Sequence, residues 1–333
     1  MVDRRSPVML ALVAALAAAG GCRGSCAGEP AAGPSSSAAE SGDEGAPGEP
    51  PPAQSSALRC EKQPFAAELA IGEASGATYV VEGESSYIAV VGDSGNRGRI
   101  VWLDPSDGRL LWRGRLPMDG GASDDLEGLS SRDGVLYGLT SSGWMRHWRR
   151  IAEPGTAGAA YELTVPAYPL AGPGRLRCAS PHHTNCARDY EGLCLRSGPV
   201  AAGQCVGFAA SKRDGALYCL IIEDDGRLAI DPARVISVVP PAVLSGCHFA
   251  TDHFATGPGQ GEAGGEALWL GSNLFGLSRV HRVTGWQRDA VVIGNVGTLG
   301  SGFPEAIAVY QDAIYRFSDT AAATSLADKY LCQ

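Results

Sequence analysis

The sequence predicts an all-β protein, and within that class a β-propeller, from three observations. Glycine contributes 45 of the 333 residues, about twice ordinary usage, and glycines often mark tight turns. Short runs rich in β-branched and aromatic residues recur between turn residues beyond residue 57. One of these segments also recurs in a fixed register. Four short strands repeated about every 45 to 50 residues are typical of a propeller, in which each blade packs against its neighbours.

The repeat is clearest in two segments, LEGLSSRDGVLYGLTSS and PEAIAVYQDAIYRFSDT. Without a gap, Glu127 aligns with Glu305 and Tyr137 with Tyr315. A third copy, AASKRDGALYCLIIEDDG, shares the turn residues and places Tyr218 on Tyr137. Each copy predicts a strand, a turn and a second strand. In order, the five copies begin at Ser86, Leu126, Ala209, Glu266 and Pro304.

These copies predict five blades, with a sixth if residues 169–205 contain one. A β-sandwich also has short strands with frequent turns, but the fixed register of Glu127 and Glu305 favours the propeller. The last copy has only three candidate strands before the chain ends. We therefore expect the first segment of the domain, residues 58–71, to supply the fourth strand and close the ring. The propeller domain is assigned to residues 57–333.

The N-terminus predicts export. Arg4 and Arg5 precede an uncharged run whose apolar part, residues 8–19, is too short to span the ~30 Å hydrocarbon core of a bilayer. Residues 1–21 therefore have the pattern of a signal peptide. The run ends in Ala-Gly-Gly-Cys22, which resembles the lipobox of bacterial lipoproteins and implies cleavage before Cys22 and a diacylglycerol on its sulfur. An ordinary secretory signal cleaved nearby is the alternative.

A low-complexity segment follows the predicted lipidation site. Residues 27–56 consist mainly of Ala, Gly, Pro, Ser and Glu and contain no aromatic or branched aliphatic side chain. Such a segment buries too little apolar surface to offset its ordering entropy. We interpret residues 22–56 as a disordered tether. The expected location is the bacterial cell envelope, periplasmic or at the cell surface, with membrane contact only through the lipid.

Ten cysteines fit an exported chain. Eight lie in the predicted domain, and their even number favours disulfides. A structural zinc site is the weaker alternative, because the chain has no C-x-x-C pair. Closing the ring would bring Cys60 near Cys332, so we expect that bridge. The other six are expected to pair within residues 178–247, with Cys194 and Cys205 as a couple that flanks a Gly-Pro hairpin.

Candidate functional residues lie where inner strands are predicted to begin. The motif D-x-E-G-L occurs at residues 125–129 and 189–193, and Pro-Glu305-Ala-Ile is a degenerate third copy. If these strands surround the channel, the carboxylates of Glu127, Glu191 and Glu305 converge at one mouth and repel one another. Calcium suits such a set of oxygen ligands. Alternatively, each carboxylate accepts backbone N–H groups at the start of its strand and does no chemistry.

These motifs carry a family resemblance. DLEGL and DYEGL, together with GDSGN at residues 92–96, resemble the esterase-like propeller domain associated with bacterial phytases. The resemblance covers residues 70–330 and implies an acidic channel mouth, which binds calcium in some relatives. Glu127 and Glu191 are the motif acids by this resemblance. Glu305 joins them by the internal alignment and Asp93 by its position, giving a predicted calcium site of four residues.

Composition removes several functional classes. The net charge of −9 disfavours nucleic-acid binding, and a chain with three lysines offers few Schiff-base candidates. No G-x-S-x-G or H-E-x-x-H motif is present. Two hypotheses remain for what we expect to be a monomer. It is either a metal-dependent hydrolase of an ester or phosphoester, or a non-enzymatic envelope protein that binds a partner.

Overall fold

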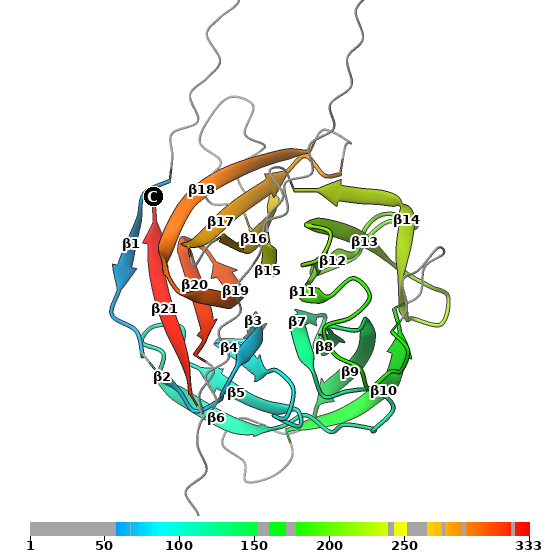
Figure 1. The fold of residues 1–333 in the computed structure, drawn as a ribbon. Coiled ribbons are helices and arrows are strands. Elements are labelled where there is room, and N and C mark those ends of the chain that lie inside the picture. The colour runs from blue at the N-terminus through cyan, green and yellow to red at the C-terminus, as the bar shows by residue number, and fades with distance from the viewer. Residues whose placement is uncertain are drawn as a thin grey trace, which may run out of the picture. The chain divides into compact units, whose positions relative to one another are not determined.

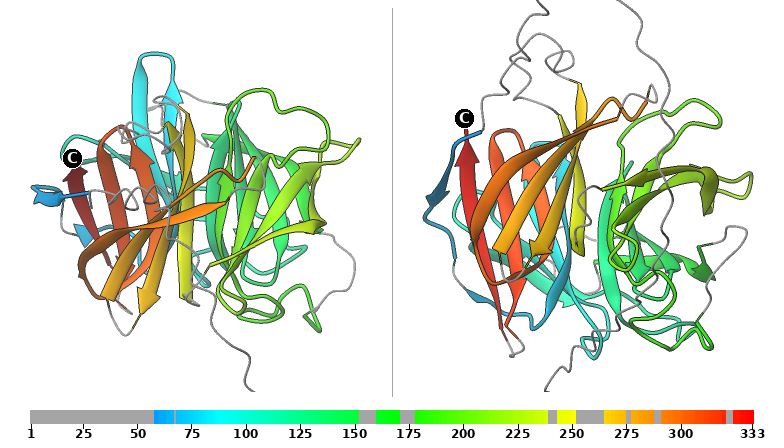
Figure 2. Two further views of the ribbon diagram at one scale, coloured as in Figure 1. Left: turned by 90° about the horizontal axis from the view of Figure 1, so that it is seen from above. Right: turned by 45° about the horizontal axis from the view of Figure 1, so that its top comes forward.

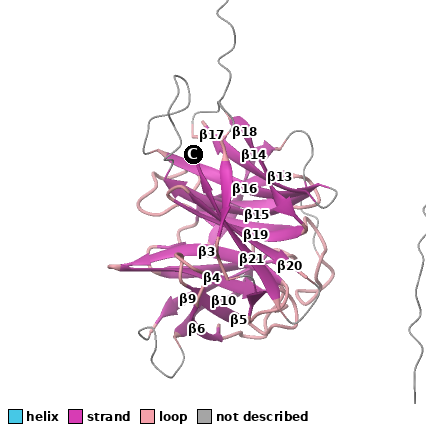
Figure 3. Ribbon diagram, turned by 90° about the vertical axis from the view of Figure 1, so that its left-hand side faces the viewer, coloured by secondary structure: helices cyan, strands magenta, loops and turns pink. Residues whose placement is uncertain are grey.

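The computed structural model describes residues 58–66, 68–151, 160–170, 178–238, 243–251, 265–274, 277–287, 291–320 and 324–333. The predicted signal peptide, Cys22 and the tether lie outside these ranges. Within them the chain is all-β, with strands and loops only (Figure 3). The same residues include no helix long and apolar enough to traverse a lipid bilayer.

The strands form five sheets around a central axis, seen along the axis in Figure 1 and from two other directions in Figure 2. Blade 1 contains β3 (Ala74–Glu82), β4 (Ser85–Gly92), β5 (Arg99–Leu103) and β6 (Leu110–Arg115). Blade 2 contains β7 (Leu126–Arg132), β8 (Val135–Thr140), β9 (Trp144–Arg150) and β10 (Tyr161–Pro169). Blade 3 contains β11 (Tyr190–Leu195), β12 (Gly207–Ser211), β13 (Ala216–Ile222) and β14 (Leu228–Ser237).

Blade 4 contains β15 (Val243–Thr251), β16 (Glu266–Leu274), β17 (Leu277–Thr284) and β18 (Val292–Ser301). Blade 5 contains β19 (Phe303–Tyr310), β20 (Ala313–Asp319) and β21 (Ser325–Cys332), and β1 (Cys60–Gln63) is its outermost strand. The short strand β2 (Glu68–Leu69) also pairs with β21. The five-bladed propeller predicted from the sequence is therefore confirmed. No sixth blade forms, because the described part of 169–205 supplies β11 and the loops around it.

The N-terminal segment closes the ring as predicted. β1 runs antiparallel to β21, and Cys60 lies opposite Cys332 in that register. The two cysteines form a disulfide. The apolar core divides into clusters between adjacent blades, for example the cluster of Trp102, Leu126 and Trp148 between blades 1 and 2. Each sheet therefore buries both faces against neighbouring sheets.

All five innermost strands contain a β-bulge near their start. The cross-strand register skips one residue in each of β3, β7, β11, β15 and β19. The skipped residues are Ser75, Glu127, Glu191, Ser245 and Glu305. A bulge re-aims a side chain that would otherwise alternate with the pleat. The acidic motif residues thus occupy equivalent positions around the axis.

Glycines directly after these bulges allow the inner strands to approach closely. A β-carbon at Gly128 would lie 2.6 Å from the backbone nitrogen of Leu193 in the next blade. A β-carbon at Gly76, Gly192 or Gly246 would lie 3.0–3.2 Å from backbone atoms of the neighbouring inner strand. A side chain at these positions would therefore be crowded by backbone. The glycine of the E-G-L motif is therefore explained by ring packing.

Polar side chains further along the inner strands connect different blades, both neighbouring blades and blades 4 and 1 across the channel. Thr78 Oγ1 accepts a hydrogen bond from the backbone N–H of Ser131, at 3.2 Å. Ser130 Oγ likewise accepts from the backbone of Leu195, at 2.9 Å. His248 Nε2 accepts from the N–H of Tyr79 in blade 1, at 3.2 Å. These bonds satisfy backbone N–H groups that point toward the channel and not toward a neighbouring strand of the same sheet.

Two sequence-based expectations were wrong in detail. The copy beginning at Ala209 covers β12 and β13, the second and third strands of blade 3, whereas Tyr137 lies on the second strand of blade 2. The shared Arg-Asp-Gly turn misled the alignment, because a hairpin turn is a local feature that suits any adjacent pair of strands. Tyr218 is therefore not equivalent to Tyr137.

The expected Cys194–Cys205 disulfide is absent. Cys194 bridges to Cys247 in the next blade, and Cys205 bridges to Cys219 within blade 3. In the β11–β12 register Cys194 lies opposite Phe208, three residues beyond Cys205, so that hairpin does not place the two cysteines together. Cys178 pairs with Cys186. All three bridges fall within residues 178–247, as expected.

Candidate functional site at the channel mouth

The mouth of the channel at the start of the inner strands is acidic. Glu127 is 5% exposed and Glu191 is 2% exposed. Burial raises the pKa of Glu127, and the charges of Glu191, Asp93, Asp125 and Glu305 raise it further. The structure thus brings together the three glutamates named from the sequence, and Asp93 with them. Lone ionised carboxylates are costly at such burial, so this cluster needs protons or a cation.

Three of the acids approach most closely. Asp93, Asp125 and Glu127 each offer a carboxylate oxygen, and these oxygens all lie within 4.8 Å of one another. Asp93 follows β4, in a turn held by Asn96, whose side-chain amide donates to the backbone oxygens of Asp93 and Gly72 at 3.1 Å. Asp125 and Glu127 come from the start of β7. No described basic side chain makes an ion pair with any of the three.

Asp125 is the most deeply buried acid of the group, at 1% exposed. Its Oδ2 accepts a hydrogen bond from the hydroxyl of Ser141. Its Oδ1 is buried and has no hydrogen-bond partner. Burial raises the pKa of Asp125 to about 8, and the adjacent Asp93 contributes to the increase. A buried oxygen without a donor is rare in folded proteins, and here it lies beside two further carboxylates.

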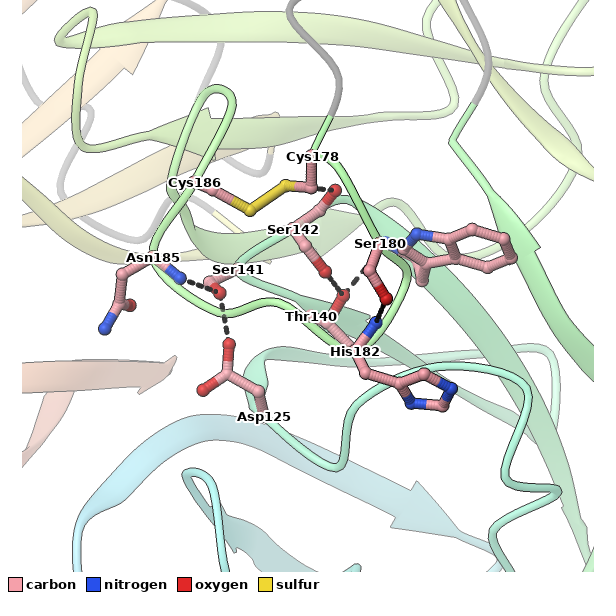
Figure 4. The surroundings of a disulfide bond; sticks show 10 residues. Asp125, Thr140, Ser141, Ser142, Cys178, Ser180, His182, Asn185 and Cys186 are labelled. Carbon is pink, nitrogen blue, oxygen red and sulfur yellow. Dashed lines mark hydrogen bonds between the residues drawn. A yellow bond between two sulfur atoms is a disulfide. The ribbon is translucent and has the colours of Figure 1, made fainter.

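A small disulfide loop holds Asp125 in place (Figure 4). The backbone N–H of Asn185, inside the Cys178–Cys186 loop, donates to Ser141 Oγ at 2.9 Å. That hydroxyl accepts the hydrogen bond from Asn185 and donates its own proton to Asp125 Oδ2. The chain from the loop to Ser141 to Asp125 therefore limits the rotation of the carboxylate.

A buried arginine fixes the segment that leads to Asp125. Arg146 on β9 is fully buried, and its Nε donates to Asp119 Oδ1 at 2.9 Å. Its terminal nitrogens donate to the backbone oxygens of Ser123 at 3.0 Å and Ala122 at 2.9 Å. These bonds pair the guanidinium with one carboxylate and two carbonyls, as a buried charge requires. Arg146 thereby positions the residues directly before Asp125.

The other acids at the mouth face a lysine. Lys212 Nζ lies 3.0 Å from Glu191 Oε1, and the lysine side chain is 38% exposed. Burial raises the pKa of Glu191 to about 9, although Lys212 opposes this increase. Burial also raises the pKa of Glu305, while Lys212 and a hydrogen bond with Glu191 lower it. Lys212 therefore partly neutralises the half of the mouth that contains Glu191 and Glu305. The half that contains Asp93, Asp125 and Glu127 has no such basic partner among the described residues.

Two residues of the mouth were not named as site residues from the sequence. Asp125 is the first residue of D-x-E-G-L, so its repetition in the motif was the available signal. Lys212 directly follows β12 and is one of three lysines in the chain. No local pattern connects it with Glu191, because that contact depends on how β11 and β12 pair.

The channel narrows directly beneath the acids. The space lined by Glu127, Glu191 and the ring of glycines amounts to about 10 Å³. That volume is at the lower limit for a single water molecule. A ligand therefore reaches the acids from the mouth, past the partly exposed Asp93, Lys212 and Glu305.

No protein-family model matches this chain, and no curated protein does. Among solved structures, it is similar to Myxococcus xanthus glutaminyl cyclase, with 14% identity, 83% of this chain and 97% of that chain covered, and a TM-score of 0.43. It is also similar to BamB from Moraxella catarrhalis, with 13% identity over 78% of this chain and a TM-score of 0.32. The match covers 59% of that BamB chain.

Proposed function

We propose that this protein is a calcium-binding β-propeller of the bacterial cell envelope. The ion is held at the channel mouth by Asp93, Asp125 and Glu127, and Glu191 and Glu305 complete the acidic surroundings. The observation that carries the proposal is the buried, unpartnered Oδ1 of Asp125, whose side chain lies in a cluster of carboxylate oxygens within 4.8 Å of one another.

Electrostatics supports a cation at this place. Three buried or half-buried carboxylates without a basic partner either retain protons or bind a cation. A divalent ion satisfies the oxygen of Asp125 and removes the repulsion that raises the pKa of Glu127. The donors are all oxygen atoms, which favours calcium over zinc, a metal that prefers nitrogen and sulfur ligands.

The envelope location rests on the cysteines and the N-terminus. Four disulfides indicate a chain that folds in an oxidising compartment outside the cytoplasm. We propose that Cys22 carries the lipid and that residues 22–56 tether the propeller to the membrane. A Cys22→Ser protein is then expected in the soluble fraction of lysed cells. Equal membrane association of the variant and the parent protein would contradict the anchor.

Binding is the activity that the geometry supports best. The space directly beneath the acids is only about 10 Å³, and the bound ion would be presented at one face of the ring. We therefore favour an envelope binding protein whose partner docks at this face over a hydrolase.

Hydrolysis of an ester or phosphoester is the second candidate, and Glu191 is the observation in its favour. Because its pKa is raised to about 9, its carboxyl group carries a proton at neutral pH and has the form of a general acid. A panel of generic esters and phosphoesters tests this candidate. Calcium-dependent turnover that is lost in Glu191→Gln would favour the hydrolase.

Calorimetry and thermal unfolding test the calcium site. The full-length protein, freed of metal with a chelator, is titrated with calcium chloride. We expect saturable binding and a higher melting temperature, because the ion binds only the native state. Asp125→Asn should abolish both effects. Asp225→Asn, in the exposed turn between β13 and β14, is the matched control and should retain them.

These measurements distinguish a calcium site at the assigned acids from an ion bound elsewhere and from carboxylates with a purely structural role. Absence of binding in the parent protein would remove the calcium proposal. Unchanged binding in Asp125→Asn would place the ion elsewhere. If the carboxylates serve as structural acceptors without an ion, amidation lowers the melting temperature equally with and without calcium.

A further inference from the structure

A cavity of about 480 Å³ lies between blades 2 and 3, next to the Cys178–Cys186 loop. Its size is within the usual range for small-molecule sites. Ser142, Cys178 and Ser180, which are labelled in Figure 4, are among its lining residues. Its main walls are apolar and aromatic, formed by Trp144, Leu170, Tyr190, Tyr218, Ile230 and Val235. Such walls suit the apolar body of an organic molecule.

This cavity is separate from the acidic mouth. None of the five acids of the mouth lines it. Tyr190 lines the cavity, whereas the next residue, Glu191, is the bulge residue of β11 and belongs to the mouth. Strand β11 therefore stands between the two features. A ligand in the cavity does not depend on an ion at the mouth.

Arg188 is the charged group of the cavity with free donors. Its guanidinium carbon lies 3.8 Å from the centre of the Tyr218 ring, a stacked position. Its Nε forms an ion pair with Asp214 Oδ2 at 3.9 Å, a distance too long for a hydrogen bond. Asp214 instead accepts a hydrogen bond from the hydroxyl of Tyr218 at 2.6 Å. The guanidinium thus makes no hydrogen bond to any residue in the described ranges.

Hydrogen bonds fix the backbone at Arg188, although the N–H donors of its guanidinium group are free. Its carbonyl oxygen accepts hydrogen bonds from the hydroxyl of Ser211 at 2.6 Å and from the N–H of Arg213 at 3.4 Å. The contact with Tyr218 holds the guanidinium group over the face of the ring. An arginine ordered in this way loses little conformational freedom when it binds an anion, and its planar set of donors matches a carboxylate or sulfonate.

We propose that this cavity binds a small aromatic or aliphatic molecule that carries one carboxylate or sulfonate group. The apolar body packs between Trp144, Tyr190 and Tyr218, and the anionic group accepts hydrogen bonds from Arg188. The site is a second binding site of the propeller, independent of the proposed calcium site.

A matched pair of fluorescent probes tests the proposal. 1-Anilinonaphthalene-8-sulfonate carries the anion, and N-phenyl-1-naphthylamine has the same rings without it. Each is titrated into the native full-length protein while its fluorescence is recorded. We expect the sulfonate to bind more tightly than the neutral probe, by about tenfold, because a hydrogen bond to a charged group contributes about that factor.

Variants locate the binding. Arg188→Gln should reduce affinity for the sulfonate by about tenfold and leave the neutral probe unchanged. Val235→Trp should fill the cavity and weaken binding of both probes. Asp107→Asn, in the exposed turn between β5 and β6, should alter neither, and circular dichroism checks that each variant remains folded.

Three results would overturn the proposal. These are no binding of the sulfonate to the parent protein, equal affinity for the two probes, or sulfonate binding that Arg188→Gln and Val235→Trp both leave intact. Loss of sulfonate binding in Asp107→Asn would place the probe away from this cavity and contradict the assigned site. Because calcium is absent from these titrations, their outcome is separate from that of the calcium experiment.

Discussion

Gly128 in blade 2 faces the backbone of Leu193 in blade 3 so closely that a β-carbon would lie 2.6 Å from the Leu193 nitrogen. The atoms it would meet belong to an inner strand whose position is set by its own sheet. Neither strand moves without disturbing a blade. The close approach of inner strands therefore depends on the absence of a side chain at this point.

Gly128→Ala should accordingly destabilise the protein. We expect a loss of about 3 kcal/mol in the free energy of unfolding, at the upper end for overpacked sites because the clash is with backbone. Urea unfolding measures it. Gly294→Ala is the matched control, since a β-carbon there meets only the carbonyl oxygen of Arg282 at 3.8 Å. Equal stability of the two variants would contradict the packing argument.

The disulfides should contribute unequally to stability. Cys60–Cys332 spans 272 residues and Cys178–Cys186 spans 8. By chain entropy, the long loop contributes on the order of 5 kcal/mol and the short loop about 2.5 kcal/mol. The double Cys→Ser variant of the ring-closing pair should therefore melt at a lower temperature than that of the small loop. The reverse order in calorimetry would show that closure through β1 contributes little.

Stability should fall in mildly acidic solution through His248. Burial lowers its pKa to about 4, whereas an unfolded histidine titrates near 6.5. Between these values the unfolded state binds the extra proton, so the contribution of His248 is complete above about pH 6.5 and is lost as the pH falls toward 4. Protonation also removes the acceptor for the N–H of Tyr79.

His248→Gln should reduce this pH dependence. The test compares urea midpoints of the parent protein and the variant from pH 7 to pH 4. The exposed His183→Gln serves as the control, and the difference between curves cancels the titration of the acidic mouth. Parallel curves for the parent and His248→Gln would exclude His248 as a source of the acid sensitivity.

Calcium affinity should increase with pH. The raised pKa of Asp125, about 8, means that its carboxyl group retains a proton at pH 6, which the ion must displace. Displacing one such proton predicts binding on the order of a hundredfold weaker at pH 6 than at pH 9. Titration calorimetry at the two values measures the ratio. Equal calcium affinity at pH 6 and pH 9 would contradict the assignment of Asp125 as a ligand of the ion.

The paired variant Glu127→Gln, Glu191→Gln extends this test. The raised pKa of each acid favours its neutral, protonated form, which glutamine resembles, so the metal-free protein should be as stable as the parent or more stable. Its calcium-dependent rise in melting temperature should disappear. A retained rise would show that these two acids do not contribute to the site.

The fold and the acidic mouth were largely predictable from the sequence because their signals are local. Alternating strands, turn glycines and the repeated D-x-E-G-L motif each lie within a few residues, and they correctly predicted five blades and the convergence of Glu127, Glu191 and Glu305. The copy at Ala209 shows the limit. A hairpin turn specifies two adjacent strands but not which pair in a blade they form.

The ring and its acids thus follow from the sequence by itself, whereas the tertiary structure decided which groups meet across blades. The Cys194–Cys247 bridge, the Ser141 hydroxyl on Asp125 and the contact of Lys212 with Glu191 all join residues from different strands or loops. Such contacts depend on the stagger of neighbouring strands and on the bulges that re-aim their side chains. No local sequence pattern encodes them, because they exist only once the five sheets have packed around one axis.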